Sequence, residues 1–172
     1  MKLLPLAASA ALVALPLQVH AATLEDHDYL WKTLTSSGLS IYINPKFCWE
    51  DHELMGAYIG KHKALIVCQT NKTTPGKAVD WTADDLDTFR HEAHHFVQDC
   101  MVGDNFDSVL GPIYRDPVKL GVDVLSEDTV LRIIEVYSDK PPQTQVNEIE
   151  AFAVAALNDP IEQARDVHKF CF

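Results

Sequence analysis

The chain has 172 residues, of which 47% are apolar and 23% are charged, with nine prolines and seven glycines. This composition excludes a collagen, a disordered chain and a low-complexity linker, and the length suits one domain. The formal net charge of −11 argues against nucleic acid or an anionic membrane surface as a partner.

The first 21 residues have the pattern of a secretory signal peptide. Lys2 precedes an apolar, uncharged stretch from Leu3 to Leu17, and Val19-His20-Ala21 then places small or tolerated residues where a signal peptidase would cut. The stretch is short for a membrane span of about 20 residues and contains two prolines. We therefore expect residues 1–21 to be removed on export, to the periplasm or outside the cell, and 22–172 to form a single monomeric domain.

The four cysteines all follow the signal peptide. Export to an oxidising compartment favours two disulfides over free buried thiols, and four cysteines allow three pairings. No C-x-x-C pair is present, which argues against a zinc ribbon or a thioredoxin-type site. Of the three pairings we favour Cys48–Cys68, stapling a small sheet, with Cys100–Cys171, tying the C-terminus to a central helix.

The first half of the chain combines one helix with three short strands. Apolar spacing predicts a helix that begins at Thr23 and stops at Gly38. The other expected elements are a strand over 39–43 and a hairpin of 55–59 with 64–68.

The second half of the chain is helical. Thr82 caps a helix that ends at Gly103, with Asp85 completing a capping box. Three further helices are expected over 126–137, 144–157 and 159–170, and the Gly-, Asp- and Pro-rich segment 103–125 is expected to be a long loop. The predicted fold is α+β, with a small antiparallel sheet of about three strands on one side of four or five helices.

A zinc-binding motif lies in the middle of the helix that Thr82 begins. His91-Glu92-Ala93-His94-His95 fits H-E-x-x-H, and residues four apart project from the same face of a helix. Two imidazoles placed in this way can hold one zinc ion at about 2.0–2.1 Å. Glu92 would then lie beside the ion, where it can accept a proton from the attacking water. The alternative is a solvated histidine-rich face without a metal.

A zinc site of this type needs a third protein ligand. The strongly apolar helix 144–157 contains Glu148 and Glu150, which flank its core stripe on opposite sides. A buried carboxylate is costly unless it is paired or bound to a metal. Spacing alone does not decide between these two glutamates.

The two motifs together resemble the gluzincin, or thermolysin-like, metallopeptidases. The resemblance covers roughly residues 55–157, and in that family an Asn often precedes the third ligand, as Asn147 precedes Glu148 here. It implies a minimal zincin-like domain with His91, His95 and Glu148 as zinc ligands and Glu92 as general base.

The resemblance also implies where a substrate would bind. The segment 56–60 is similar to a family edge strand that pairs with the substrate backbone. The family often has an aspartate four residues after the ligand glutamate, where this chain has Phe152. No oxyanion-stabilising residue is assigned; the candidates are Tyr114, Arg115, Arg132, Tyr137 and His168.

The sequence therefore predicts an exported zinc metallopeptidase that acts on peptides or proteins. One alternative is a zinc-binding protein without catalytic activity. The other is a metal-free exported domain held together by its disulfides.

Overall fold

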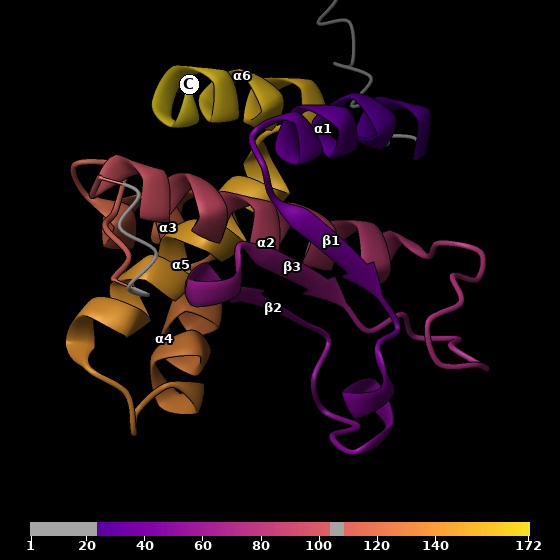
Figure 1. Ribbon diagram of the computed structural model, residues 1–172. Helices are drawn as coiled ribbons and strands as arrows, with labels where there is room; N and C mark the ends of the chain where they lie inside the picture. The colour runs from indigo at the N-terminus through magenta and orange to yellow at the C-terminus, as the bar shows by residue number, and fades with distance from the viewer. Residues whose placement is uncertain (1–23, 104–108) are drawn as a thin grey trace, which may run out of the picture.

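The computed structural model describes residues 24–103 and 109–172, so the predicted signal peptide lies outside the described residues. The described part contains six α-helices and a three-stranded sheet, which confirms the α+β class (Figure 1). In chain order the elements are α1 (Leu24–Ser36), β1 (Ser40–Ile43), η1 (Lys46–Trp49), β2 (Gly56–Ile59), η2 (Gly60–His62), β3 (Ala64–Val67), α2 (Ala83–Met101), α3 (Pro117–Leu125), α4 (Glu127–Val136), α5 (Pro142–Leu157) and α6 (Pro160–Cys171).

The sheet is mixed, whereas the sequence predicted an antiparallel one. β3 lies in the centre and pairs antiparallel with β2, as the predicted hairpin requires, but parallel with β1. All four residues of β3 are buried, while those of β1 alternate between exposed and half-buried. The most apolar strand therefore takes the central position, and it separates the two strands that precede it in the chain.

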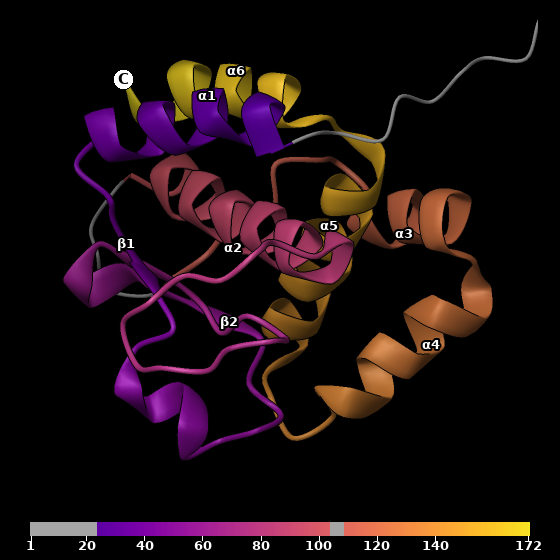
Figure 2. The same cartoon turned by 90° about the vertical axis from the view of Figure 1, so that its right-hand side faces the viewer.

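Helix α2 lies at the centre of the molecule. Its capping box forms as predicted, with the Asp85 N–H donating to the Thr82 hydroxyl at 3.1 Å and the Thr82 N–H donating to the Asp85 carboxylate at 2.9 Å. α1 and α6 lie side by side along one flank of α2 (Figures 1 and 2).

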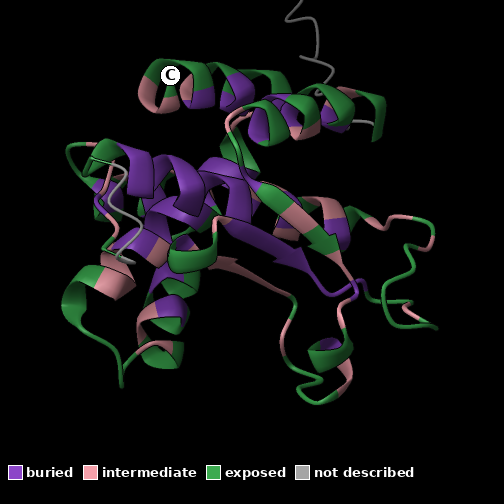
Figure 3. Cartoon of the chain, viewed as in Figure 1, coloured by how far each residue is buried: buried purple, intermediate pink, exposed green. Residues whose placement is uncertain are grey.

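The second half of α2 is largely enclosed by other elements. Every residue from His91 to Cys100 is buried, and Figure 3 shows this part of the helix in purple. α5 packs against the side of α2 that carries the histidines, so His91 and His95 lie between the two helices.

Helix α3 lies within the segment that the sequence predicted to be a loop. Asp116 caps it by accepting from the Lys119 N–H at 3.0 Å, and Pro117 occupies its first turn. Gly121 lies inside this helix and does not mark a turn. A Cβ at this position would lie only 2.4 Å from Cγ2 of Ile149 on α5. The glycine instead allows α3 to pack closely against α5.

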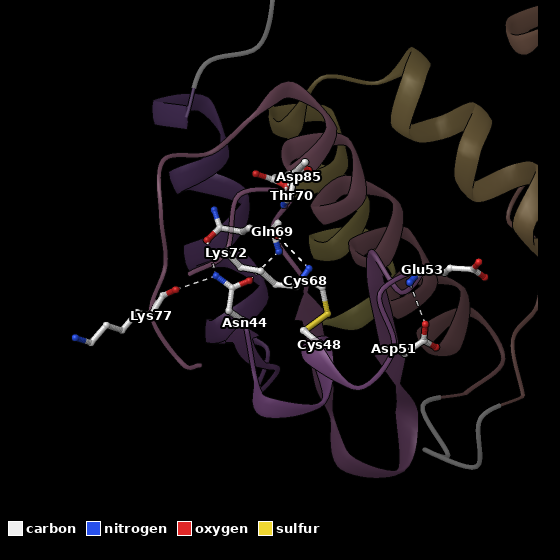
Figure 4. The surroundings of a disulfide bond; sticks show 10 residues. All are labelled: Asn44, Cys48, Asp51, Glu53, Cys68, Gln69, Thr70, Lys72, Lys77 and Asp85. Carbon is white, nitrogen blue, oxygen red and sulfur yellow. Dashed lines mark hydrogen bonds between the residues drawn. A yellow bond between two sulfur atoms is a disulfide. The ribbon is translucent and has the colours of Figure 1, made fainter. Parts of the chain in front are cut away.

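Both predicted disulfides are present. Cys48–Cys68 joins η1 to the residue after β3 (Figure 4), and Cys100–Cys171 joins the last turn of α2 to the end of α6. Two such bonds indicate that the protein folds in an oxidising compartment. Among the described helices, none has the length and apolar character needed to cross a membrane.

We expect the longer disulfide loop to contribute more stability. Because the cross-linked residues are 71 apart in Cys100–Cys171 and 20 apart in Cys48–Cys68, replacing each pair by serines should cost about 4 and about 3 kcal/mol. Urea unfolding of the two double variants checks this order. The reverse order would mean that unfolded-chain entropy does not govern the effect.

Candidate metal centre

The structure brings three predicted ligands together from two helices. His91 and His95 lie one turn apart on α2, and their Nε2 atoms are 3.0 Å apart. Glu148 on α5 places its Oε2 3.1 Å from His91 Nε2 and its Oε1 3.5 Å from His95 Nε2. One donor atom from each residue lies within 4.8 Å of the other two.

These separations suit a single metal ion. Tetrahedral ligands at 2.0–2.1 Å from zinc lie about 3.3 Å from one another. Two neutral imidazoles and one carboxylate are a donor set found around zinc with a further position left for solvent. The side chains of His91, His95 and Glu148 therefore form a buried site that can bind one divalent ion.

The electrostatics of the three residues favour a cation between them. Burial opposes a positive charge on His95, but the hydrogen bond and charge of Glu148, helped by Glu92 and Gln98, raise its pKa to about 9. Burial also opposes the charge on Glu148, but hydrogen bonds from His91 and His95 hold its pKa well below the usual range. Both shifts in pKa show that this group of side chains stabilises a positive charge.

Glu92 lies beside the three ligands. Its carboxylate accepts a hydrogen bond from the backbone N–H of Tyr58 on β2. Burial raises the pKa of Glu92, while the charges of His91 and His95 partly offset that rise. A carboxylate whose pKa is raised in this way is a better proton acceptor at neutral pH than an exposed one.

Glu150 is not part of this group. Its side chain is fully buried and accepts from His94 Nε2 at 2.9 Å and from the backbone N–H groups of Ile113 and Tyr114, both at 2.9 Å. The two glutamates thus have different partners, with Glu148 beside His91 and His95 and Glu150 beside His94. His94, the middle histidine of the motif, is a structural partner of Glu150.

A cleft reaches the metal centre from the edge of the sheet. Two cavities of about 220 and 240 Å³ share four lining residues, Gly56, His91, Glu92 and Tyr137. Gly56 is required for this geometry, since a Cβ there would lie 2.6 Å from Thr88 Cγ2 and 2.9 Å from Glu92 Cγ. The edge strand β2 can therefore approach α2 closely at this point.

The register of β2 directs part of its backbone toward the cleft. The Cys68 N–H donates to the Met55 carbonyl at 2.8 Å, so the alternation of an antiparallel pair turns Gly56 and Tyr58 away from β3. The bond from the Tyr58 N–H to Glu92 agrees with this direction. β2 is thus the edge strand that the sequence predicted, and it borders the metal centre.

Of the five oxyanion candidates, Tyr137 lies closest to the ligands. Burial, together with the charge of Glu148 and a hydrogen bond to it, raises the pKa of Tyr137. The hydroxyl therefore stays protonated and donates a hydrogen bond to the Glu148 carboxylate.

The other four candidates do not line the two cavities at the ligands. The Tyr114 backbone binds Glu150, and Arg115 is exposed. Arg132 lines a separate cavity beside Tyr137, and the His168 ring packs on Phe172.

The surroundings of the two ligand histidines differ. Nδ1 of His95 lies 2.8 Å from Oε1 of Gln98, a residue that the sequence analysis did not select. Nδ1 of His91 is buried and has no hydrogen-bond partner among the described residues. The ring of Phe152 lies against His91, with 4.3 Å between the ring centroids. An apolar ring therefore lies where His91 would need a hydrogen-bond acceptor.

Comparison with models of known protein families, with curated proteins and with solved structures finds no match to this chain. Its chemistry therefore has to be inferred from the site.

Proposed function

We propose that this chain is an exported, zinc-dependent hydrolase that cleaves peptide bonds and resembles a minimal gluzincin. The observation that carries the proposal is the convergence of His91, His95 and Glu148 within 4.8 Å. The signal-like N-terminus and the two disulfides support export.

The ligands and Glu92 would divide the reaction between them. His91, His95 and Glu148 would hold zinc, which when bound polarises a carbonyl and increases the acidity of a water molecule. Glu92 would accept the proton of the attacking water and pass it to the leaving amine. Its position next to the ligands, but outside the set of three, supports this role.

The cleft supports a peptide as the substrate. An extended chain can add to the edge of a sheet through backbone hydrogen bonds, and β2 is an edge strand beside His91 and Glu92, where the Tyr58 N–H already donates to Glu92 and Gly56 also faces away from β3. The Tyr137 hydroxyl, whose one proton is directed to Glu148 in this structure, would turn that proton to the oxygen that becomes negatively charged. Phe152 and Tyr137 also line an apolar cavity of about 220 Å³, which suits an apolar side chain of the substrate.

Metal content and peptide cleavage test the proposal together. We expect about one zinc per chain by mass spectrometry after purification without chelators, and loss of that zinc in His91→Ala. The wild-type protein should cleave members of a broad peptide library, and His91→Ala should cleave none.

The two alternatives predict different results in the same experiment. A folded, zinc-loaded wild-type protein that cleaves no peptide would be a zinc-binding protein without this activity. A folded wild-type protein that binds no zinc would be a metal-free domain held by its disulfides, and the proposal would be wrong.

A further inference from the structure

The amide of Gln98 is held in one orientation behind the metal centre. Gln98 is fully buried on α2, and its Nε2 donates to the Asn147 carbonyl at 3.1 Å and to Glu150 Oε1 at 3.0 Å. Both of these partners are acceptors, so the NH₂ group has to face them. Oε1 of Gln98 is therefore the atom that faces His95.

This orientation of the amide determines which ring nitrogen of His95 carries the proton. An amide oxygen can only accept, so His95 Nδ1, at 2.8 Å, has to be the donor. In the neutral ring the proton then stays on Nδ1, and the lone pair of Nε2 points toward His91 and Glu148. That is the tautomer that a metal bound by Nε2 requires.

Glu150 fixes the position of Gln98. Its carboxylate is held by His94 on α2 and by two backbone N–H groups, those of Ile113 and Tyr114, so it cannot turn toward another partner. The hydrogen bonds form a continuous path from the segment before α3, through Glu150 and Gln98, to His95. No residue along this path other than His95 contacts the metal position.

His91 has no equivalent path. Its Nδ1 is buried without a partner in the described part of the chain, next to the Phe152 ring. Of the two Nδ1 atoms, only that of His95 therefore has a hydrogen-bond partner in the described part of the chain. That partner is the amide of Gln98.

We propose that Gln98, oriented by Glu150, is the positioning residue that sets the tautomer of His95 and thereby the metal affinity of the site. The inference rests on the proposed zinc-binding function. Loss of a hydrogen-bond partner behind a metal ligand typically lowers metal affinity about 10- to 100-fold.

The test compares two buried glutamines. Gln98→Met keeps the length of the side chain and removes the amide. Gln163→Met is the matched control, because Gln163 on α6 is equally buried but its amide has no hydrogen-bond partner among the described residues. Zinc affinity is measured by competition with a coloured chelator, and folding by thermal melting.

We expect Gln98→Met to weaken zinc binding about 10- to 100-fold and Gln163→Met to leave it unchanged. If Gln98→Met is folded and binds zinc as tightly as the wild type, the positioning role is wrong while the zinc site stands. If the wild type binds no zinc, the proposed function itself fails.

A measurement on the wild-type protein does not depend on how the variant folds. In the zinc-loaded protein, ¹⁵N-resolved NMR should show a proton on His95 Nδ1 that exchanges slowly with solvent. A proton on Nε2 of His95, with the metal on Nδ1, would overturn the proposal.

Discussion

Glu92→Gln should abolish peptide hydrolysis while zinc stays bound. The amide has the shape of the carboxylate but cannot accept the proton of the attacking water, so the rate should fall by about 10²- to 10⁴-fold. Zinc should remain, because Glu92 is not one of the three residues whose donor atoms converge. Initial rates on a cleaved library peptide and metal content by mass spectrometry measure the two effects.

The control for this variant is Glu162→Gln, an exposed glutamate in the first turn of α6. It makes the same chemical change away from the cleft and should keep the wild-type rate. Wild-type turnover by Glu92→Gln would rule out this residue as the general base. Loss of zinc from Glu92→Gln would instead show that its carboxylate takes part in binding the metal.

Glu148→Gln should lose zinc affinity and keep its fold, whereas Glu150→Gln should lose its fold. Glu148→Gln removes a charged ligand at the edge of the cleft, and the protein should still fold. Its zinc affinity should fall by more than about 100-fold, which is a larger loss than that expected when a ligand loses only its hydrogen-bond partner. Glu150→Gln turns an NH₂ group toward buried donors that now bind the carboxylate, among them the Gln98 amide and the backbone N–H groups of Ile113 and Tyr114. Each buried donor left without a partner costs about 1–3 kcal/mol, so this variant should be largely unfolded.

Thermal melting and zinc titration of the two variants, side by side, distinguish these outcomes. A stable Glu150→Gln that loses zinc, beside a Glu148→Gln that retains it, would exchange the roles of the two glutamates. Equal losses of stability in both would mean that the carboxylates share one structural role.

The local features of the site could be predicted from the sequence. The spacing of His91 and His95 and the cap at Thr82 depend only on helix geometry, and the helix forms as expected. Both cysteine pairings were also predicted.

What the sequence could not provide depends on contacts between elements. Glu148 and Glu150 look alike on α5, and only the crossing of α5 over α2 places one beside His95 and the other beside His94. Tyr137 reaches Glu148 because α4 folds back toward α5, which no periodicity encodes.

Two features were missed although a signal was present. Asp116-Pro117 is the same combination of cap and first-turn proline that Asp159-Pro160 form in α6, but the Gly-, Asp- and Pro-rich composition of 103–125 indicated a loop. Gln98 lies three residues after His95, a spacing at which side chains on a helix meet. A search for acceptors one turn beyond each histidine would have found it.

The bridge between Cys100 and Cys171 also affects when the ion can enter. It anchors the last turn of the helix that carries both imidazoles, and the hydrogen bonds around Glu150 come from groups of the protein itself. Assembly of the scaffold and capture of the metal can therefore be separate events in time. The ion would then be acquired from whatever the destination compartment supplies, after the chain has reached its final shape.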